Sequence, residues 1–472
     1  MRTLPILSAC LLLVIAAGLV PASTPFAAAE ESGSKGLISA WTYPVTGARR
    51  LHRDPLWGGD STAAIVIETE DQIHLLETGG ERRWSFEVHA GVEWLRVAPS
   101  YLLLSDGNAE LHAIDTTNGT IAWSHRAQDA LWTALAHGDY WLIVDDRNLL
   151  RSHRLEDGRI AWNRLLDPIR NKWLPSVYFA SIPGNGDIVL IEEAHLSRLN
   201  SEDGNVSWRV DLPAAARSGA LSRDGRVILP AGRSLVAYDL TGGERLWGHD
   251  LGATSYFATL VPGHEKVVAA TETDRLVGID IVSGRRLWEA ETSIALTRLF
   301  SSDGPAPSGS VAYVESRRKL SRSRKPWKRA NAPLLLADEK NAYLISSAFA
   351  LQAFDVNNGR ARWRVPLKNG KSRLVLSGNS LCAGSWWEAP QCIDPESGKV
   401  RWKSDFGKAQ IRDLGDGVLL AWGKEHLRVI EADTGRLLRH AEFEDSPLDL
   451  LILSDPRLLV VALPDAVEAY RW

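Results

Sequence analysis

Short stretches that alternate apolar and polar residues, separated by turn-forming residues, run through almost the whole chain. Residues 111–115 read LHAID, and residues 235–239, 276–280 and 351–355 read LVAYD, LVGID and LQAFD. An alternation with a period of two puts every second side chain on the same face of an extended chain, so these stretches predict β-strands. Residues 37–472 contain no helical pattern of useful length, and the sequence therefore predicts an all-β fold.

Each strand of this kind leads into the same turn. An Asp, Asn or Glu ends the strand, a glycine follows four residues later, and a tryptophan stands four residues after the glycine. The side-chain oxygen can accept hydrogen bonds from backbone N–H groups of the turn, and glycine reaches the positive φ that reverses the chain. Complete copies of this unit are formed by Asp115, Gly119, Trp123, Asp239, Gly243, Trp247, Asp280, Gly284, Trp288, Asp355, Gly359, Trp363, Asp394, Gly398 and Trp402.

Three positions depart from the unit. Leu76 and Arg154 stand where other copies have the acidic or amide residue, and Arg439 replaces the tryptophan. Several copies have a small residue at the centre of the incoming strand, which predicts the close approach of a neighbouring sheet: Ala113, Ala237, Gly278 and Ala353. We interpret the unit as a repeated structural fastening, so a functional site is expected where the pattern breaks.

The spacing of the units predicts how the chain is organised. Most successive turn glycines are 37 to 41 residues apart, and about four short strands fill each period, as in one β-propeller blade. Residues 467–472 repeat the strand that enters the turn, and residues 37–44 resemble the tryptophan strand. We therefore expect a single large propeller of four-stranded antiparallel blades. Pairing of the N- and C-terminal strands closes the ring and removes the open sheet edges.

The pattern leaves the number of blades open, at about 8–10. Propellers usually have about 4–8 blades, whereas nine marked turns and one split blade give ten. The step from Gly284 to Gly359 is 75 residues long and contains Trp327, so a degenerate additional unit is a further alternative.

Composition adds two observations. The 472 residues include 19 tryptophans and a single methionine, so the fold requires a large, rigid packing residue repeatedly. The net charge of −4 argues against nucleic acid as a partner.

A Ser- and Pro-rich insertion at about 301–333 interrupts the repeats. It carries a run of basic residues without an acidic one: Arg317, Arg318, Lys319, Arg322, Arg324, Lys325, Lys328 and Arg329. This run is interpreted either as a solvated loop or as an electrostatic contact with an anionic surface or an acidic partner.

The first residues have the features of an export signal. Arg2 precedes an apolar run from Leu4 to Val20, and the small residues 27–29 offer a cleavage site. A lipid anchor at Cys10 is not expected, because the apolar run continues past it. We predict a signal peptide over 1–29, a short linker over 30–36 and the propeller over 37–472. The protein is then exported and is periplasmic or associated with the cell envelope.

Two cysteines flank a stretch where two short strands turn back on each other. In an exported protein a cross-strand disulfide between Cys382 and Cys392 is expected, and two buried free thiols are the alternative. Trp386 and Trp387 lie at the tip of this predicted hairpin. Adjacent residues of a strand point to opposite faces, so one of the two indoles should be exposed. Exposed tryptophans favour interfaces.

The repeat Leu-x-Ala-Φ-Asp-x-x-x-Gly-x-x-x-Trp resembles that of the PQQ-like, or quinoprotein-type, β-propellers over nearly all of residues 37–472. That family includes PQQ-dependent dehydrogenases and non-enzymatic propellers such as the BamB-like outer-membrane assembly lipoproteins. The resemblance to the BamB-like members implies a non-catalytic envelope scaffold. Such a scaffold binds an envelope protein partner and acts in outer-membrane protein assembly.

The resemblance also implies an alternative, a PQQ-dependent dehydrogenase or a small-ligand binder that would use PQQ with calcium. Those dehydrogenases usually hold the quinone against two adjacent cysteines, and this chain has no such pair. No acidic residue can be aligned with their calcium ligands, and no His-x-x-x-His or calcium-loop spacing occurs. We therefore expect no enzyme, and we predict no catalytic, cofactor-binding or metal-binding residue.

Overall fold

The structure, a computed structural model, describes residues 35–53, 64–98, 100–126, 131–145, 147–167, 178–181, 187–192, 194–216, 221–273, 275–292, 335–345, 350–367, 372–454 and 456–472. Within these ranges every regular element is a β-strand, as the alternating pattern predicts. No helix in the described residues is long and apolar enough to cross a membrane. The predicted signal peptide lies outside these ranges.

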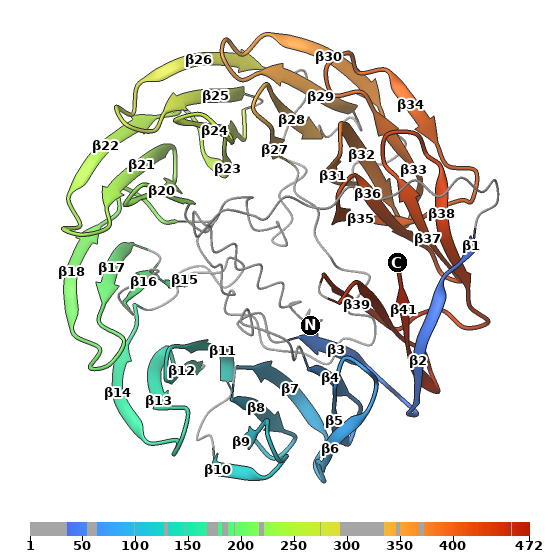
Figure 1. Cartoon of the computed structure of the whole chain (residues 1–472). Coiled ribbons are helices and arrows are strands. Elements are labelled where there is room, and N and C mark those ends of the chain that lie inside the picture. The colour runs from blue at the N-terminus through green and yellow to red at the C-terminus, as the bar shows by residue number, and fades with distance from the viewer. Residues whose placement is uncertain are drawn as a thin grey trace.

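The strands form ten sheets arranged as blades around a ring, which confirms the predicted propeller (Figure 1). We number the blades along the chain. Blades 1 to 5 are built from β3 (Arg50–Arg53), β4 (Ile65–Glu68), β5 (Gln72–Leu76) and β6 (Arg82–Glu87); β7 (Val92–Val97), β8 (Tyr101–Asp106), β9 (Glu110–Asp115) and β10 (Ile121–Arg126); β11 (Leu131–His137), β12 (Tyr140–Asp145), β13 (Leu149–Arg154) and β14 (Ile160–Leu165); β15 (Tyr178–Ser181), β16 (Ile188–Ile191), β17 (His195–Leu199) and β18 (Val206–Asp211); and β19 (Leu221–Arg223), β20 (Arg226–Ala231), β21 (Ser234–Asp239) and β22 (Arg245–Asp250).

The second half of the ring follows the same plan. Blades 6 to 10 are built from β23 (Ser255–Leu260), β24 (Lys266–Thr271), β25 (Arg275–Asp280) and β26 (Arg286–Glu291); β27 (Leu335–Ala337), β28 (Asn341–Ile345), β29 (Ala350–Asp355) and β30 (Ala361–Pro366); β31 (Arg373–Ser377), β32 (Ser380–Ser385), β33 (Glu388–Ile393) and β34 (Val400–Lys403); β35 (Gln410–Gly415), β36 (Val418–Trp422), β37 (His426–Glu431) and β38 (Leu437–Glu442) with β1 (Lys35–Gly36); and β39 (Asp449–Leu453), β40 (Leu458–Ala462) and β41 (Ala466–Arg471) with β2 (Ile38–Pro44).

The two ends of the chain close the ring, as predicted. Strand β2 pairs antiparallel with β41, from Ile38 opposite Arg471 to Pro44 opposite Ala466, and so becomes the outermost strand of blade 10. The short β1 adds to the neighbouring blade by pairing parallel with β38, which places Lys35 opposite Arg439. Both pairings cover strand edges that would otherwise be open.

The antiparallel order of each blade gives the ring two different faces. Successive strands run in opposite directions, so connections alternate between the two ends of the blade. One face carries the Asp–Gly turns between the third and fourth strands, and we call it the turn face. The other carries the hairpins between the second and third strands and the connections between blades, and we call it the hairpin face.

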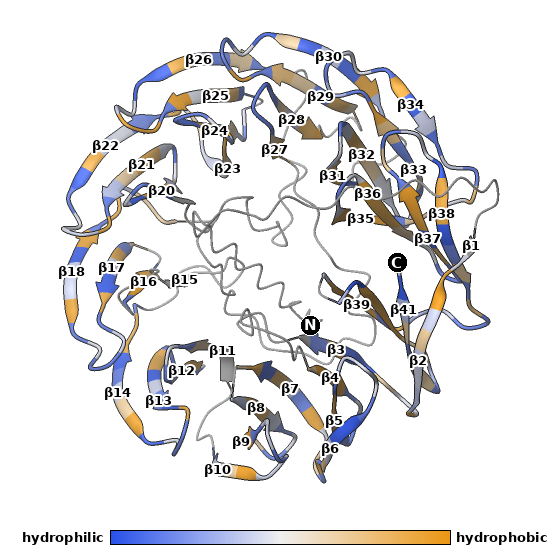
Figure 2. Cartoon of the chain, viewed as in Figure 1, coloured by the Kyte–Doolittle hydropathy of each residue, from blue (hydrophilic) through white to orange (hydrophobic). Residues whose placement is uncertain are grey.

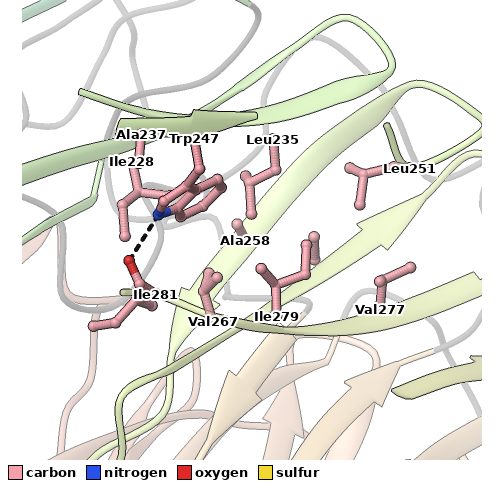
Figure 3. Packing of buried hydrophobic residues seen from close by; sticks show 11 residues of the cluster. Ile228, Leu235, Ala237, Trp247, Leu251, Ala258, Val267, Val277, Ile279 and Ile281 are labelled. Atoms are coloured by element: carbon pink, nitrogen blue, oxygen red, sulfur yellow. Dashed lines mark hydrogen bonds between the residues drawn. The ribbon is translucent and has the colours of Figure 1, made fainter. Parts of the chain in front are cut away.

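The apolar core lies between the blades. One cluster joins Ile228 and Leu235 of blade 5 to Val267 and Val277 of blade 6 (Figure 3). Each fully buried side chain of this size contributes about 1.5–3 kcal/mol. The outer strands carry polar and apolar segments in turn (Figure 2), because one side chain packs inward while its neighbours meet solvent, as in the exposed-exposed-buried pattern that begins β22.

The tryptophan of the repeated unit fastens each blade to the next one. Trp247 donates from Nε1 to the carbonyl of Ile281 in the following blade, at 2.8 Å (Figure 3). Its indole ring lies directly against Gly284, where an added Cβ would meet the ring at 2.5 Å. The same donor and acceptor geometry recurs for Trp41, Trp84, Trp123, Trp162, Trp208, Trp288, Trp363 and Trp402.

The structure explains two of the departures from the unit. In blade 1 the amide of Gly80 bonds to the carbonyl of Glu77, so the turn is one residue shorter and Glu77, not Leu76, holds the acidic position. Arg439 replaces a tryptophan in blade 9 because the next blade ends at the chain terminus. That blade has no turn between β41 and β2 against which an indole could pack.

The eleventh unit that the sequence left open does not stand between blades 6 and 7, because Trp288 donates directly to Val356 and packs on Gly359. These contacts make the two blades neighbours, and Trp327 lies outside the described residues. The small residues of the incoming strand meet a neighbouring sheet, as predicted, since Ala113, Ala237 and Ala353 belong to apolar clusters shared with the next blade. They also leave room for the tryptophan of their own blade. Gly278 is the register partner of Trp288, and a Cβ there would lie 2.2 Å from its ring.

Candidate functional site

Among the residues that the structure describes, an exposed tryptophan stands on the hairpin face at the tip of blade 8. Trp386 and Trp387 form the turn between β32 and β33. Trp386 packs against the apolar cluster shared by blades 9 and 10, whereas Trp387 is 49% exposed. The structure therefore separates the two indoles as the sequence predicts, with one directed into the core and one directed to solvent.

The hairpin that carries Trp387 is held rigidly at its base. Cys382 and Cys392 are opposite residues of β32 and β33, both are fully buried, and their sulfurs are joined in a disulfide. Nearer the tip, the buried hydroxyl of Ser372 donates to the buried carboxylate of Glu388 at 3.0 Å. A rigid support lowers the entropy cost of using an exposed indole for binding.

The described residues that flank the predicted basic insertion lie on the same face. Its eight basic residues lie outside the described part of the chain. The residues that flank it, Thr292 after β26 and Leu335 at the start of β27, belong to a connection between blades, and such connections lie on the hairpin face. Both predicted interaction elements, the indole pair and the insertion, are therefore attached to one side of the ring.

A charged cluster joins blades 3 and 4 on the hairpin face. His195 pairs with Asp167 through Nδ1 and lies 3.1 Å from Asp211 through Nε2. Arg209 donates to Asp167 at 2.9 Å and lies 3.7 Å from the buried Glu192. Burial raises the pKa of Asp167, but hydrogen bonds from His195 and Arg209 outweigh it and hold the pKa below its usual value.

The composition of this cluster is compatible with metal binding, since the ligand atoms of Asp167, Glu192 and His195 lie within 4.8 Å of one another. However, the Arg209 guanidinium also lies 2.9 Å from His195 Nδ1. A protein cation already neutralises the carboxylates, so we interpret the cluster as an ion-pair network between blades. Sequence reasoning missed it because its members come from separate strands.

A second cluster closes the hairpin of blade 2. Asp106 accepts from the amides of Asn108 and Glu110 at 2.9 Å, and His112 lies 3.7 Å from its carboxylate. Blade 3 repeats the arrangement with an arginine six residues after the aspartate, where Arg151 bonds to Asp145 at 2.6 Å. Because a guanidinium replaces the imidazole at the equivalent position, hairpin closure explains this cluster better than a metal does.

The repeated acidic residues on the turn face are structural, as interpreted from the sequence. The carboxylate of Asp280 accepts from the amides of Ser283 at 2.7 Å and Val282 at 3.1 Å. The hydrogen bond from the Ser283 amide is the largest cause that lowers the pKa of Asp280. Each such carboxylate is occupied by its own turn, and the ring spreads these turns over separate blades.

The residues do not fit the quinone alternative. The cysteines described here, Cys382 and Cys392, lie ten residues apart and are bonded across two strands inside the core of blade 8, so neither can stack on a cofactor as an adjacent pair would.

Comparison with known proteins gives one family and many distantly similar structures, of which two are described here. A model of the family described as "Outer membrane protein assembly factor BamB" matches residues 69–194, 192–324 and 334–467. No curated protein matches. The crystal structure of BamB from Moraxella catarrhalis is 11% identical, covers 92% of this chain and 98% of its own, and has a TM-score of 0.42. The computationally designed Ika8 protein is 11% identical, covers 73% and 97%, and has a TM-score of 0.41. These structural similarities are too distant to transfer the role of any residue.

Proposed function

The chain belongs to the BamB family of PQQ-like propellers, and on that premise we propose that it is a non-catalytic scaffold of the cell envelope. In this proposal the ring holds its hairpin face rigid, and a protein partner binds there at the tip of blade 8. The description of the family supports a role in outer-membrane protein assembly. The export signal expected over residues 1–29 supports the location.

The exposure of Trp387 is the observation that carries this proposal. An indole that is 49% exposed leaves a large apolar surface in water although Trp386, next to it, is packed into the core. Tryptophan is among the residues most enriched where truncation to alanine weakens binding strongly. The disulfide and the Ser372–Glu388 hydrogen bond hold this indole in a defined place.

The test compares purified wild-type protein with Trp387→Ala in binding envelope extracts, followed by identification of bound proteins by mass spectrometry. If Trp387 anchors the partner, its removal weakens binding by about 30-fold or more. Leu165→Ala is the matched control, because Leu165 is 71% exposed on the outer strand of blade 3. Equal recovery of one partner by the wild type and by Trp387→Ala would refute the assignment.

The quinoprotein alternative has its own assay. Purified protein is incubated with and without PQQ and calcium, and absorbance, thermal stability and dye-linked alcohol oxidation are recorded. The scaffold proposal predicts no change in any of the three. A bound-quinone spectrum together with alcohol oxidation would replace the proposal with an oxidoreductase.

A further inference from the structure

Two arginines stand on the innermost strands of neighbouring blades. Arg373 is the first residue of β31 in blade 8, and Arg412 is the third residue of β35 in blade 9. Both strands border the centre of the ring (Figure 1). Packing of Val375 against Ile411 holds the two strands together. The arginines are therefore fixed near one another at the inner rim of the ring.

Neither guanidinium has an ion-pair or hydrogen-bond partner within the described residues, although both side chains are partly buried. Burial, together with the positive charge of Arg412, lowers the pKa of Arg373 to about 10. A buried cation without a counter-charge is costly, so proteins normally pair such groups. Other arginines of this chain are paired: the largely buried Arg198 with Asp187 at 2.6 Å, and the exposed Arg275 with Glu289 at 2.6 Å.

The carboxylates nearest in the fold are already engaged. Asp449, on the innermost strand of blade 10, accepts from the amides of Leu51 and Leu450, both at 2.9 Å. Glu388 accepts from Ser372. Asp413 follows Arg412 directly, and successive residues of a strand point to opposite faces. Within the described residues Arg373 therefore has no carboxylate partner, and the negative charge of Asp449 acts on Arg412 without an ion pair or hydrogen bond between them.

We propose that Arg373 and Arg412 together bind an oxyanion, either a carboxylate or a phosphate, at the inner rim of blades 8 and 9. Each planar guanidinium can donate two parallel N–H hydrogen bonds to such a group. Partial burial strengthens these bonds, and the bound anion removes the mutual repulsion of the two cations. The site uses no residue of the tip formed by Trp386 and Trp387, and the proposal does not require a protein partner.

The test is thermal unfolding of the full chain with inorganic phosphate, acetate or glutarate in place of chloride, at constant ionic strength. Binding to the folded state raises the unfolding temperature, by roughly 2–3 °C when the anion is at about 100 times its dissociation constant. If only phosphate raises the unfolding temperature, the site binds phosphate. If glutarate raises the unfolding temperature at concentrations where acetate has no effect, the site binds a dicarboxylate.

Variants separate a site from a general salt effect. Arg373→Gln and Arg412→Gln should each weaken anion binding by roughly tenfold or more, and both should unfold at a higher temperature than the wild type when only chloride is present. Arg275→Gln is the matched control, because it removes the same charge from a paired arginine. If all three variants respond to every anion as the wild type does, the proposal is wrong.

Discussion

The fastening between blades can be tested by adding one methyl group. In Gly284→Ala the new Cβ would lie 2.5 Å from Cγ of Trp247, a distance that real contacts do not show. The indole must therefore move, and its 2.8 Å hydrogen bond to the carbonyl of Ile281 must lengthen or break. The substitution also places a side chain at φ +69°, in the left-handed region that favours glycine.

The expected cost combines these effects. Holding alanine in the left-handed region costs about 1–2 kcal/mol. Overpacking a well-filled site costs typically 1–3 kcal/mol, and losing a hydrogen bond adds about 1 kcal/mol. Gly284→Ala should therefore lower the free energy of unfolding by about 3–6 kcal/mol. Gly252→Ala is the control, because Gly252 has φ +76° with no atom within 4 Å of the added Cβ. It should lower the free energy of unfolding only by the backbone cost of about 1–2 kcal/mol.

The assay is urea unfolding followed by far-UV circular dichroism, with near-UV dichroism reporting the packing of the tryptophans. A double-mutant cycle identifies the cause. A Trp247→Gly background removes both the indole and the Cβ of residue 247, which would lie 2.6 Å from the added Cβ, so Gly284→Ala should there cost no more than Gly252→Ala. An unchanged cost of Gly284→Ala in that background would refute the reasoning, because the penalty would then not come from the indole.

Three further predictions concern the closing seam, the hairpin and the insertion. Burial raises the pKa of Asp449 from 3.8 to about 6. The contribution of this carboxyl group to stability is therefore fully present below pH 3.8 and is lost as the pH rises through 6. This loss is about 3 kcal/mol, and Asp449→Asn should remove it when the free energy of unfolding is measured at pH 4 and pH 8. If the two pH profiles coincide, the carboxylate is not buried as described. Cys382→Ser with Cys392→Ser should lower the free energy of unfolding by about 3 kcal/mol, and reductant should destabilise the wild type but not the double variant. Replacing the eight basic residues of 317–329 by Ser should leave folding intact and weaken co-sedimentation with envelope fractions, by about 1 kcal/mol per basic residue near an anionic surface; unchanged co-sedimentation would argue for a solvated loop.

The fold was predictable because its signals are local. A strand that alternates, a carboxylate that caps a turn and a glycine that reverses the chain all act within a few residues, as in the turn of Asp280 and Gly284. The repeat of that turn predicted the propeller. The terminal half-units predicted the closure through β2 and β41. Alignment by spacing alone failed at Leu76, where the turn is shorter by one residue and Glu77 has the acidic role.

The candidate sites were predictable only in part. Adjacent tryptophans at a hairpin tip predicted that one would be exposed, and Trp387 is. Arg373 and Arg412 gave no signal, because a single arginine in an apolar strand is common and the two are separated by three strands of sequence. The same holds for Asp449 and Leu51, which lie at opposite ends of the chain and meet at the seam between blades 10 and 1.

The sequence by itself determined the blade, since the turn and the strand alternation are set by residues close together in the chain. The tertiary structure decided what each blade touches. Trp247 can donate to its acceptor, the carbonyl of Ile281, only when the next blade is packed beside it. The presence of Arg439 in place of a tryptophan is explained only by the terminal blade, which lacks a turn between β41 and β2. The ring also fixed the number of blades at ten and brought the arginines of β31 and β35 to one rim. Contacts between blades depend on the angle and order of sheets around a closed circle, and no local pattern encodes that geometry.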